Sequence, residues 1–140
     1  MIVRKLTAEN SSVLMNPAEG LFDHAVQPQL TAEFLNDPRH HLVAAIDDGK
    51  VVGFVSAVHY VHPDKPTELW INEVAVAPSH RKQGLGRQML DAMLAHGRSL
   101  GCQCAWVLTD RANTPAMRLY AGAGGVENPT PAIMFEFPLT

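Results

Sequence analysis

"EVAVAPSHRKQGLGRQML", residues 73–90, is the stretch that decides the fold, because an apolar β-branched run meets a proline turn and then a basic, glycine-rich segment. Three cations, Arg81, Lys82 and Arg87, lie in this segment, and no acidic residue interrupts positions 78–90. The apolar residues that follow recur at the spacing of one helical face: Leu85, Met89, Leu90, Met93 and Leu94. The stretch therefore predicts a strand, a turn and a helix, and we call the junction, residues 78–87, the basic loop.

The length and composition of the chain are those of one globular domain, which we expect to span residues 1–140. Hydrophobic residues make up 46% and charged residues 18%, a balance that disfavours a disordered chain. The longest nearly apolar run, residues 51–61, is too short to cross a bilayer as a helix, and no apolar leader follows Met1. We therefore expect a cytoplasmic protein without a membrane partner.

The net charge of −3 comes from 11 basic and 14 acidic residues. Without the three cations of the basic loop, eight basic residues would oppose those 14 acidic ones. Proteins that bind nucleic acids usually spread basic charge over a broad face, whereas here it is concentrated in one loop. This pattern favours a single small anion as the ligand and disfavours a nucleic-acid partner.

Periodicity along the rest of the chain predicts a mixed sheet with helices packed on it. Asp48-Gly49 joins two apolar runs and predicts a hairpin, Thr7 is a candidate N-cap, and Gly101 is expected to end the helix after the basic loop. The strand–helix–strand unit of residues 68–109 should be right-handed. The expected strands are residues 2–6, 41–47, 50–61, 68–76, 102–110 and 132–139, and the expected helices begin near residues 7, 30, 85 and 113.

Cysteine and histidine spacing does not predict a metal centre. Cys102 and Cys104 are separated by one residue, which is poor geometry for a disulfide and too few ligands for zinc. His40 and His41 point to opposite faces of an extended chain, and no Cys-x-x-Cys or His-x-x-x-His pair is present. We expect a reduced cysteine pair and no bound metal.

The glycines of the basic loop have two alternative roles. A tight turn between strand and helix would need one glycine and no cations. Alternatively, Gly84 and Gly86 let backbone N–H groups approach a phosphate, and the start of the next helix adds its positive dipole end. The Gly-Lys-Ser/Thr ending of a nucleotide-hydrolase loop and the third glycine of a dinucleotide fingerprint are both absent. The three cations beside these glycines favour the second role, a site that binds an anion.

Two segments resemble the GNAT family of N-acetyltransferases. The family pattern Arg/Gln-x-x-Gly-x-Gly/Ala after a strand is met by Arg81, Gly84 and Gly86. A second family block, Asn-x-x-Ala-x-x-Leu-Tyr-x-x-x-Gly-Phe, is similar to residues 113–125, although Gly125 stands where the family often has Phe. The matching residues of this block are Asn113, Ala116, Leu119, Tyr120 and Gly124. The resemblance covers nearly the whole predicted strand and helix order.

The resemblance implies an α/β (α+β) fold with a mixed, mostly antiparallel sheet of six to seven strands and about four helices. It also implies acetyl-CoA as the cofactor, with coenzyme A as the product. The backbone amides of residues 82–87 would hold the pyrophosphate, and Val74 and Val76 would pair with the pantetheine arm. The cofactor-binding residues implied are Val74, Ala75, Val76, Arg81, Lys82, Gln83, Gly84, Leu85, Gly86, Arg87, Asn113 and Tyr120.

The same resemblance implies direct attack of a primary amine in a ternary complex. Glu73 is the candidate base, acting through water, and Tyr120 is the candidate acid for the leaving thiolate. The backbone N–H of Val74 would donate to the developing oxyanion. Another carboxylate or a chain of waters is the alternative to Glu73, and we expect His80 to be a turn residue.

Acceptor sites in this family are built from variable segments, which here include residues 16–29. The residues expected to bind the acceptor are Glu19, Phe22, Asp23 and His24, with Asp64 and Glu68 in a neighbouring loop. Their acids favour a cationic acceptor. Residues 20–23, followed by a predicted helix, and residues 71–84 are similar to the type I aminoglycoside 3-N-acetyltransferases of the gentamicin/fortimicin group. Membership of that group would mean antibiotic resistance.

Three alternatives remain open from the sequence. The acceptor could be a protein amine or a metabolite amine in place of an aminoglycoside. The chain could also be a non-catalytic module that binds or senses acyl-CoA. A homodimer is an oligomeric state that the resemblance allows.

Overall fold

The two central strands form a hairpin about the predicted turn. β2 (His40–Asp47) and β3 (Lys50–His62) pair in antiparallel fashion. Between them, Asp48 and Gly49 have φ angles of 49° and 76°. A type I′ turn requires a positive φ at both central residues, which Asp-Gly provides with little strain. The hairpin predicted from this dipeptide is confirmed.

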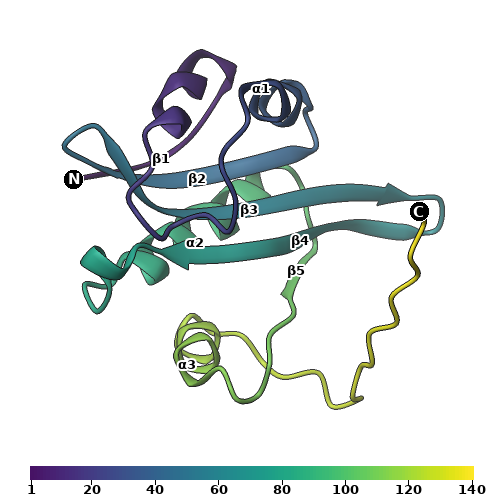
Figure 1. Cartoon of the computed structure of the whole chain (residues 1–140). Coiled ribbons are helices and arrows are strands. Elements are labelled where there is room, and N and C mark those ends of the chain that lie inside the picture. The colour runs from purple at the N-terminus through teal and green to yellow at the C-terminus, as the bar shows by residue number, and fades with distance from the viewer.

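The remaining strands extend this hairpin into a five-stranded sheet in the order β1-β2-β3-β4-β5, with β1 (Ile2–Lys5), β4 (Lys65–Val76) and β5 (Cys104–Val107). The structure is a computed structural model that describes residues 1–140. β1 to β4 are antiparallel neighbours, and β5 lies parallel to β4. The expected fold class, an α+β fold with a mixed and mostly antiparallel sheet, is confirmed (Figure 1).

Helices cover both faces of the sheet. Figure 1 shows α1 on one side of the sheet, while α2 crosses behind it. The 3-10 helices are η1 (Ala8–Met15) and η2 (Pro78–His80), and the α-helices are α1 (Pro28–Asn36), α2 (Leu85–Ser99) and α3 (Thr114–Gly122). No helix is both long enough and apolar enough to span a bilayer.

The core lies between α2 and the sheet. Leu85, Met89, Leu90 and Met93 on the predicted apolar face of α2 are all buried. Two glycines allow the helix to approach closely: a Cβ at Gly53 on β3 would lie 2.7 Å from the Met89 Cε, and a Cβ at Gly97 would lie 2.9 Å from a Leu69 methyl. The helix after the basic loop is therefore confirmed, together with its apolar face.

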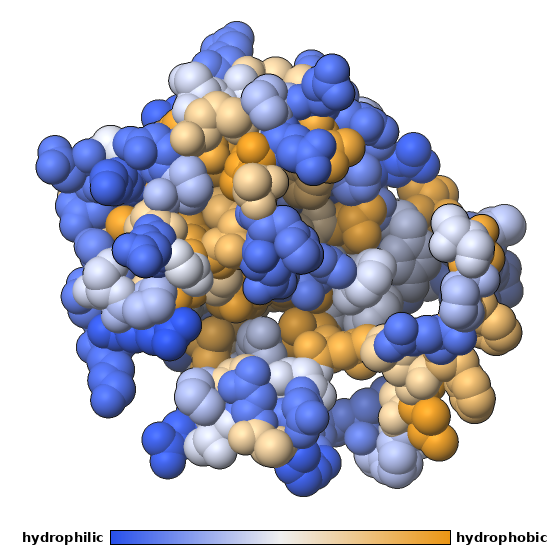
Figure 2. Space-filling model, in the orientation of Figure 1, coloured by the Kyte–Doolittle hydropathy of each residue, from blue (hydrophilic) through white to orange (hydrophobic).

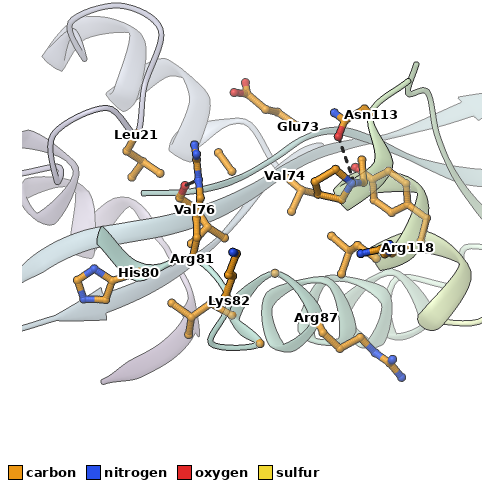
Figure 3. Close-up of a pocket in the computed structure, with 18 of the residues that line it drawn as sticks. Leu21, Glu73, Val74, Val76, His80, Arg81, Lys82, Arg87, Asn113 and Arg118 are labelled. Atoms are coloured by element: carbon orange, nitrogen blue, oxygen red, sulfur yellow. Dashed lines mark hydrogen bonds between the residues drawn. The ribbon is translucent and has the colours of Figure 1, made fainter. Parts of the chain in front are cut away.

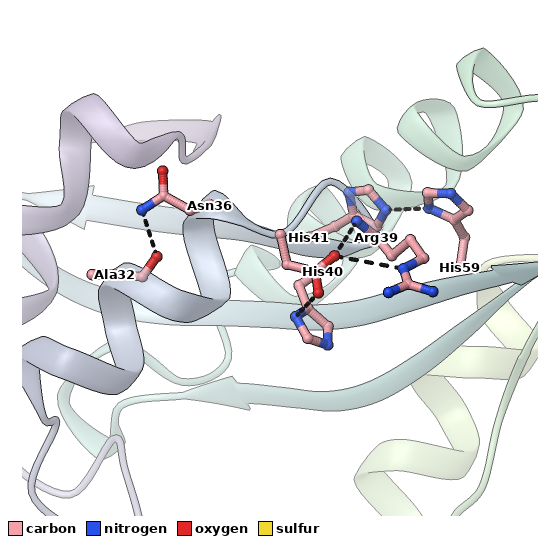
Figure 4. A network of polar contacts seen from close by, with 7 residues as sticks. Ala32, Asn36, Arg39, His40, His41 and His59 are labelled. Carbon is pink, nitrogen blue, oxygen red and sulfur yellow. Dashed lines mark hydrogen bonds and ion pairs between the residues drawn. The ribbon is translucent and has the colours of Figure 1, made fainter.

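Three histidines form a hydrogen-bonded chain between the sheet and α2. His41 is 3% exposed, and its Nδ1 lies 3.0 Å from His96 Nε2. Its Nε2 lies 2.7 Å from His59 Nδ1 (Figure 4). Burial, reinforced by His96, His59, Lys5 and His40, lowers the pKa of His41 to about 4. This histidine is therefore neutral in the folded protein near neutral pH.

Two expectations about the sheet and its helices are wrong. The sheet has five strands where six to seven were expected, because residues 132–139 form no strand. They lie in what we call the extended segment, residues 126–140, which leads away from α3 (Figure 1). The helix predicted after Thr7 forms, but as the 3-10 helix η1. The alternating apolar pattern of residues 132–139 favours a strand, yet no neighbouring strand lies beside it.

Candidate functional site

The open edge of β4 is the first element of the site. β4 and β5 pair only over Glu68–Ile71, so residues 72–76 have no neighbour on that side. The Ala77 N–H donates to Val52 O on β3 at 2.8 Å. Because successive peptide groups of a strand alternate in direction, the backbone groups of Val76 and Val74 point to the open side. The Val76 carbonyl indeed accepts a hydrogen bond there from Arg81 Nε at 3.2 Å.

A cavity of about 940 Å³ fills the space between this edge, the basic loop and α3 (Figure 3). The loop bends into it through left-handed backbone at Lys82 and Gly84, with φ of 63° and 78°. Gly84 is the N-cap of α2, so the positive end of the helix dipole faces the cavity. A Cβ at Gly84 would meet nothing within 4 Å, whereas one at Gly86 would lie 3.4 Å from Leu119 on α3. The left-handed backbone at Gly84, and not a lack of space, is therefore what favours glycine there, and a Cβ at Gly86 would make an ordinary contact with α3.

The three cations of the basic loop do not act alike. Arg81 and Lys82 both line the cavity (Figure 3), and Arg81 Nε donates to Val76 O at 3.2 Å. Arg87 also borders the cavity, but its Nε lies 3.0 Å from the Asp91 carboxylate and its Nη1 donates to Gly122 O at 2.6 Å. Arg87 is therefore already paired, because Asp91 follows one helical turn later.

His80 joins the basic loop to the β2–β3 turn. Its Nε2 lies 2.8 Å from the Asp47 carboxylate and its Nδ1 lies 2.7 Å from Ser79 Oγ. The hydrogen bond from His80 lowers the pKa of Asp47. His80 lies in η2, as expected of a turn residue, but it also lines the cavity.

α3 supplies the opposite wall of the cavity. Asn113 caps the helix, with its Oδ1 accepting from the Ala116 N–H at 3.2 Å. Tyr120 is half-buried in this wall, and desolvation raises the pKa of its hydroxyl. The Gly125 N–H donates to Tyr120 O at 2.9 Å, and a Cβ at position 125 would lie 2.8 Å from that oxygen. The glycine that departs from the family pattern is thus required by the end of this helix.

A second cavity of about 480 Å³ meets the first at two carboxylates. Glu73 and Asp23 line both cavities. Burial raises the pKa of Glu73, and the charge of Asp23 raises it further. Phe22 forms part of the wall and stacks on Phe54 with 4.5 Å between ring centroids. The two acids lie where a ligand in one cavity would contact a ligand in the other.

The structure brings most of the predicted site residues together. All predicted cofactor-binding residues except Gln83 line the first cavity. Of the predicted acceptor residues, Asp23, Phe22 and His24 line the second cavity, whereas Glu19 lines neither. Asp64 is instead paired with His62 and Lys65, and Glu68 accepts a hydrogen bond from Tyr60.

Sequence reasoning missed several residues of both cavities. Arg118 adds a cation to the first cavity, and Ser56 adds a hydroxyl to the second. Ser56 could have been found from the alternation of β3, because it faces the same side of the sheet as Phe54. The further lining residues that were not predicted as site residues are Gly20, Leu21, Pro115, Ala116, Leu119 and Gly122 in the first cavity, and Leu14, Ala25, Val26, Gln27, Leu30, Thr31, Phe34, Leu42 and Phe54 in the second.

This fold and this cavity define a family. Residues 8–124 match the model of the Acetyltransferase (GNAT) family. The match covers most of the chain, so the chain belongs to the GNAT family.

Two relatives by sequence are themselves acetyltransferases. An L-2,4-diaminobutyric acid acetyltransferase of Virgibacillus pantothenticus is 37% identical over 76 residues, which are 54% of this chain and 46% of the relative. A mycothiol acetyltransferase of Pseudarthrobacter chlorophenolicus is 30% identical over 120 residues, which are 85% of this chain and 37% of the relative. The chain therefore spans less than half the length of either relative.

Similar solved structures show the same fold. An aminoglycoside acetyltransferase from an uncultured soil metagenomic sample, in complex with sisomicin, has a TM-score of 0.85 at 15% identity, over 99% of this chain and 96% of that one. The aminoglycoside N-acetyltransferase AAC(6')-Iy, in complex with CoA, has a TM-score of 0.77 at 21% identity, over 99% of this chain and 95% of that one. At these identities the similarity concerns the fold alone.

Proposed function

We propose that the chain transfers the acetyl group of acetyl-CoA to a primary amine. The observation that carries this proposal is the first cavity, in which an open strand edge, a cationic loop and a helix N-terminus meet. An open edge offers backbone hydrogen bonds to an extended amide-containing arm, while the loop and the helix offer N–H groups and positive charge to a pyrophosphate. Acetyl-CoA contains both parts.

The residues present fit this cofactor. Val74 and Val76 would pair with the pantetheine arm, since their backbone groups point to the open side of β4. The loop backbone from Lys82 to Arg87 would hold the pyrophosphate, and the space in front of Gly84 leaves room for it. Arg81 and Lys82 would supply charge, whereas the side chain of Arg87 holds α2 to α3. When bound, acetyl-CoA supplies a thioester that an amine attacks directly.

Glu73 and Tyr120 are proposed to move the protons. An amine is protonated at neutral pH, so it must lose a proton before it attacks. The raised pKa of Glu73 brings this carboxylate closer to neutral pH, where it accepts a proton through water more readily. The raised pKa of Tyr120 keeps its hydroxyl protonated until it donates to the leaving sulfur. The Val74 N–H is a hydrogen-bond donor for the carbonyl oxygen.

The second cavity is proposed to hold the acceptor. Asp23 and Glu73 at its junction with the first cavity favour an ammonium group, and the rest of its wall is largely apolar. We therefore propose a low-molecular-weight amine as the acceptor, such as a diamine or a diamino acid. The sequence similarity to a diaminobutyric acid acetyltransferase supports this acceptor class.

An aminoglycoside is the second candidate acceptor, as predicted from the sequence. The fold similarity to aminoglycoside acetyltransferases, one of them in complex with sisomicin, supports it. An aminoglycoside carries several ammonium groups, and the position of Glu19 outside both cavities leaves fewer acids to pair with them. The salt dependence of acceptor binding separates the two candidate acceptors, because binding of a polycationic aminoglycoside weakens more steeply with rising ionic strength than binding of a small amine.

Release of free thiol from acetyl-CoA tests the proposal. The panel would contain 2,4-diaminobutyrate, a simple diamine, gentamicin and a peptide with a free N-terminus. Thiol release that depends on the amine supports the transferase. Saturable binding of acetyl-CoA without release for any amine would instead mean a non-catalytic acyl-CoA-binding module.

A further inference from the structure

The two tryptophans of the chain lie side by side, next to the point where β4 and β5 separate. Trp70 on β4 and Trp106 on β5 are register partners, and their rings stack with 5.4 Å between centroids and 12° between planes. Both side chains are only partly buried. Pairing of the two strands ends at Ile71 and Val107, and Glu73 follows two residues further along β4. A partly exposed aromatic pair therefore lies beside the proposed site of acetyl transfer.

These rings belong to a surface that continues the wall of the second cavity. Alternate residues of a strand share a face, so Ser56, Val58 and Tyr60 of β3 point to the same side of the sheet. Ser56 lines the second cavity. Val58 is the register partner of Trp70, and Tyr60 is the register partner of Glu68. We call this surface the aromatic platform, and its residues are Val58, Tyr60, Glu68, Trp70 and Trp106.

The aromatic platform is open to solvent. Each of its five residues is partly exposed. In Figure 1, α2 lies behind the sheet, and no helix crosses in front of the halves of β3 and β4 that adjoin their shared turn. Figure 2, in the same orientation, shows pale and hydrophobic side chains on this part of the molecule, right of its centre, with hydrophilic ones around them. A ligand in the second cavity could therefore extend onto the platform along one face of the sheet.

Glu68 is the only charged residue of the aromatic platform, and no cation pairs with it. Its carboxylate accepts a hydrogen bond from the Tyr60 hydroxyl at 2.8 Å, and this partner is neutral. The cations in the segments next to the platform are each paired with another acid: Arg39 with Asp37, Lys65 with Asp64, and Arg111 with Glu127. Glu68 is thus available to an ammonium group of a ligand.

The platform separates Glu68 from the acids at the junction of the two cavities. Glu73 is the register partner of Ser56 and Glu68 that of Tyr60, and four residues of a strand span about 13 Å. The surface between them is mainly apolar and aromatic. A methylene chain can cover such a surface, whereas the hydroxyls of a sugar would lose hydrogen bonds to water there. Aromatic faces also attract ammonium groups.

We propose that the acceptor is a long linear diamine or polyamine, which places its reacting amine at Asp23 and Glu73 and its far ammonium group at Glu68. Its methylene chain lies against Trp70 and Trp106. This inference rests on the proposed acetyl transfer and names the acceptor class within it. A diamino acid fits less well, because no Lys or Arg lines the second cavity to pair with its carboxylate.

Tryptophan fluorescence tests this placement, because both tryptophans of the chain belong to the aromatic platform. The protein saturated with coenzyme A would be titrated with octamethylenediamine, and we expect a saturable change in emission. Tetramethylenediamine is too short to join Glu73 to Glu68, and octylamine has the length but lacks the second ammonium group. Each should bind about three- to tenfold more weakly than octamethylenediamine.

Two variants assign the effect to the charge of Glu68. Glu68→Gln keeps an oxygen that accepts the hydrogen bond from Tyr60, so it removes little besides the charge. It should weaken binding of octamethylenediamine about three- to tenfold and leave binding of octylamine unchanged. Glu9→Gln is the control, because Glu9 is exposed on η1 and lines neither cavity, and this variant should bind all three amines as the wild type does.

Three results would overturn the inference. The first is equal affinity of the wild type for octamethylenediamine and octylamine, since the far ammonium group would then have no partner. The second is a Glu68→Gln variant that binds octamethylenediamine as tightly as the wild type. The third is binding of the diamine, seen by calorimetry, without a change in tryptophan emission. If Glu68→Gln does not fold, the comparison of the two equally long amines on the wild type decides.

The titration does not depend on acetyl transfer. Failure of every amine to release thiol from acetyl-CoA would overturn the proposed function and leave the binding result intact. Transfer to another amine, with no preference for octamethylenediamine over octylamine, would instead overturn only the inference about the platform.

Discussion

Substitution of Gly84 by valine separates its role in the turn from its role in binding, because Gly49 is a matched control. Both glycines have left-handed backbone, with φ of 78° and 76°, and a Cβ at either would meet nothing within 4 Å. A left-handed conformation costs an L-residue about 1–2 kcal/mol. Both Gly84→Val and Gly49→Val should therefore lower the melting temperature by at least about 3–8 °C.

Of these two glycines, Gly84 lines the first cavity and Gly49 does not, so only Gly84→Val should weaken binding of the cofactor. Acetyl-CoA at 100 times its dissociation constant stabilises a folded protein by about 2.7 kcal/mol, which is roughly 8–11 °C in melting temperature for a chain of this size. Gly49→Val should keep this increase and Gly84→Val should lose it. The assay is thermal unfolding with and without acetyl-CoA. If Gly84→Val retains the full increase, the basic loop is only a turn.

The remaining predictions concern catalysis and pH. Tyr120→Phe should lower kcat by about 10²–10⁴-fold with little change in the KM for acetyl-CoA, and an unchanged kcat would exclude Tyr120 as the acid. Glu73→Gln should remove the acidic limb of the profile of kcat/KM against pH, and Asp23→Asn should move this limb to lower pH because the charge of Asp23 raises the pKa of Glu73. A limb that persists in Glu73→Gln would assign the base elsewhere. The pKa of His41 is depressed from 6.5 to about 4 on folding, so the unfolded chain binds this proton first as the pH falls. The stability present above pH 6.5 should therefore decrease by up to about 3 kcal/mol towards pH 4 in urea titrations. His41→Phe should flatten this slope, and an unaltered slope would place the titrating group elsewhere.

Features set by local sequence were predictable. Asp48-Gly49 encodes a turn through the φ angles that it permits, and the apolar stripe of α2 requires burial wherever the helix packs. The glycines of the basic loop were also found from sequence, because their number and the cations beside them exceed what a turn needs. In each case the deciding interaction lies within a few residues.

Features set by tertiary partners were not predictable in the same way. Residues 132–139 have the apolar pattern of a strand, but a strand forms only where the segment reaches an edge of a sheet. In this structure no strand pairs with these residues. The contact of Arg87 with Gly122 O at the end of α3 joins residues far apart in the sequence, whereas its ion pair with Asp91 is one helical turn away and could have been found from the sequence. Glu19 belongs to an irregular segment whose path the sequence does not specify, and it lies outside both cavities.

Transfer of a labelled acetyl group tests the central claim most directly. Acetyl-CoA carrying ¹³C in its acetyl group would be incubated with each amine of the panel, and the products would be identified by mass spectrometry and NMR. We predict a labelled amide on a low-molecular-weight amine, formed in proportion to the thiol released and reduced at least about a hundredfold in Tyr120→Phe. Thiol release without a labelled amide, or equal labelling by the wild type and Tyr120→Phe, would contradict the account.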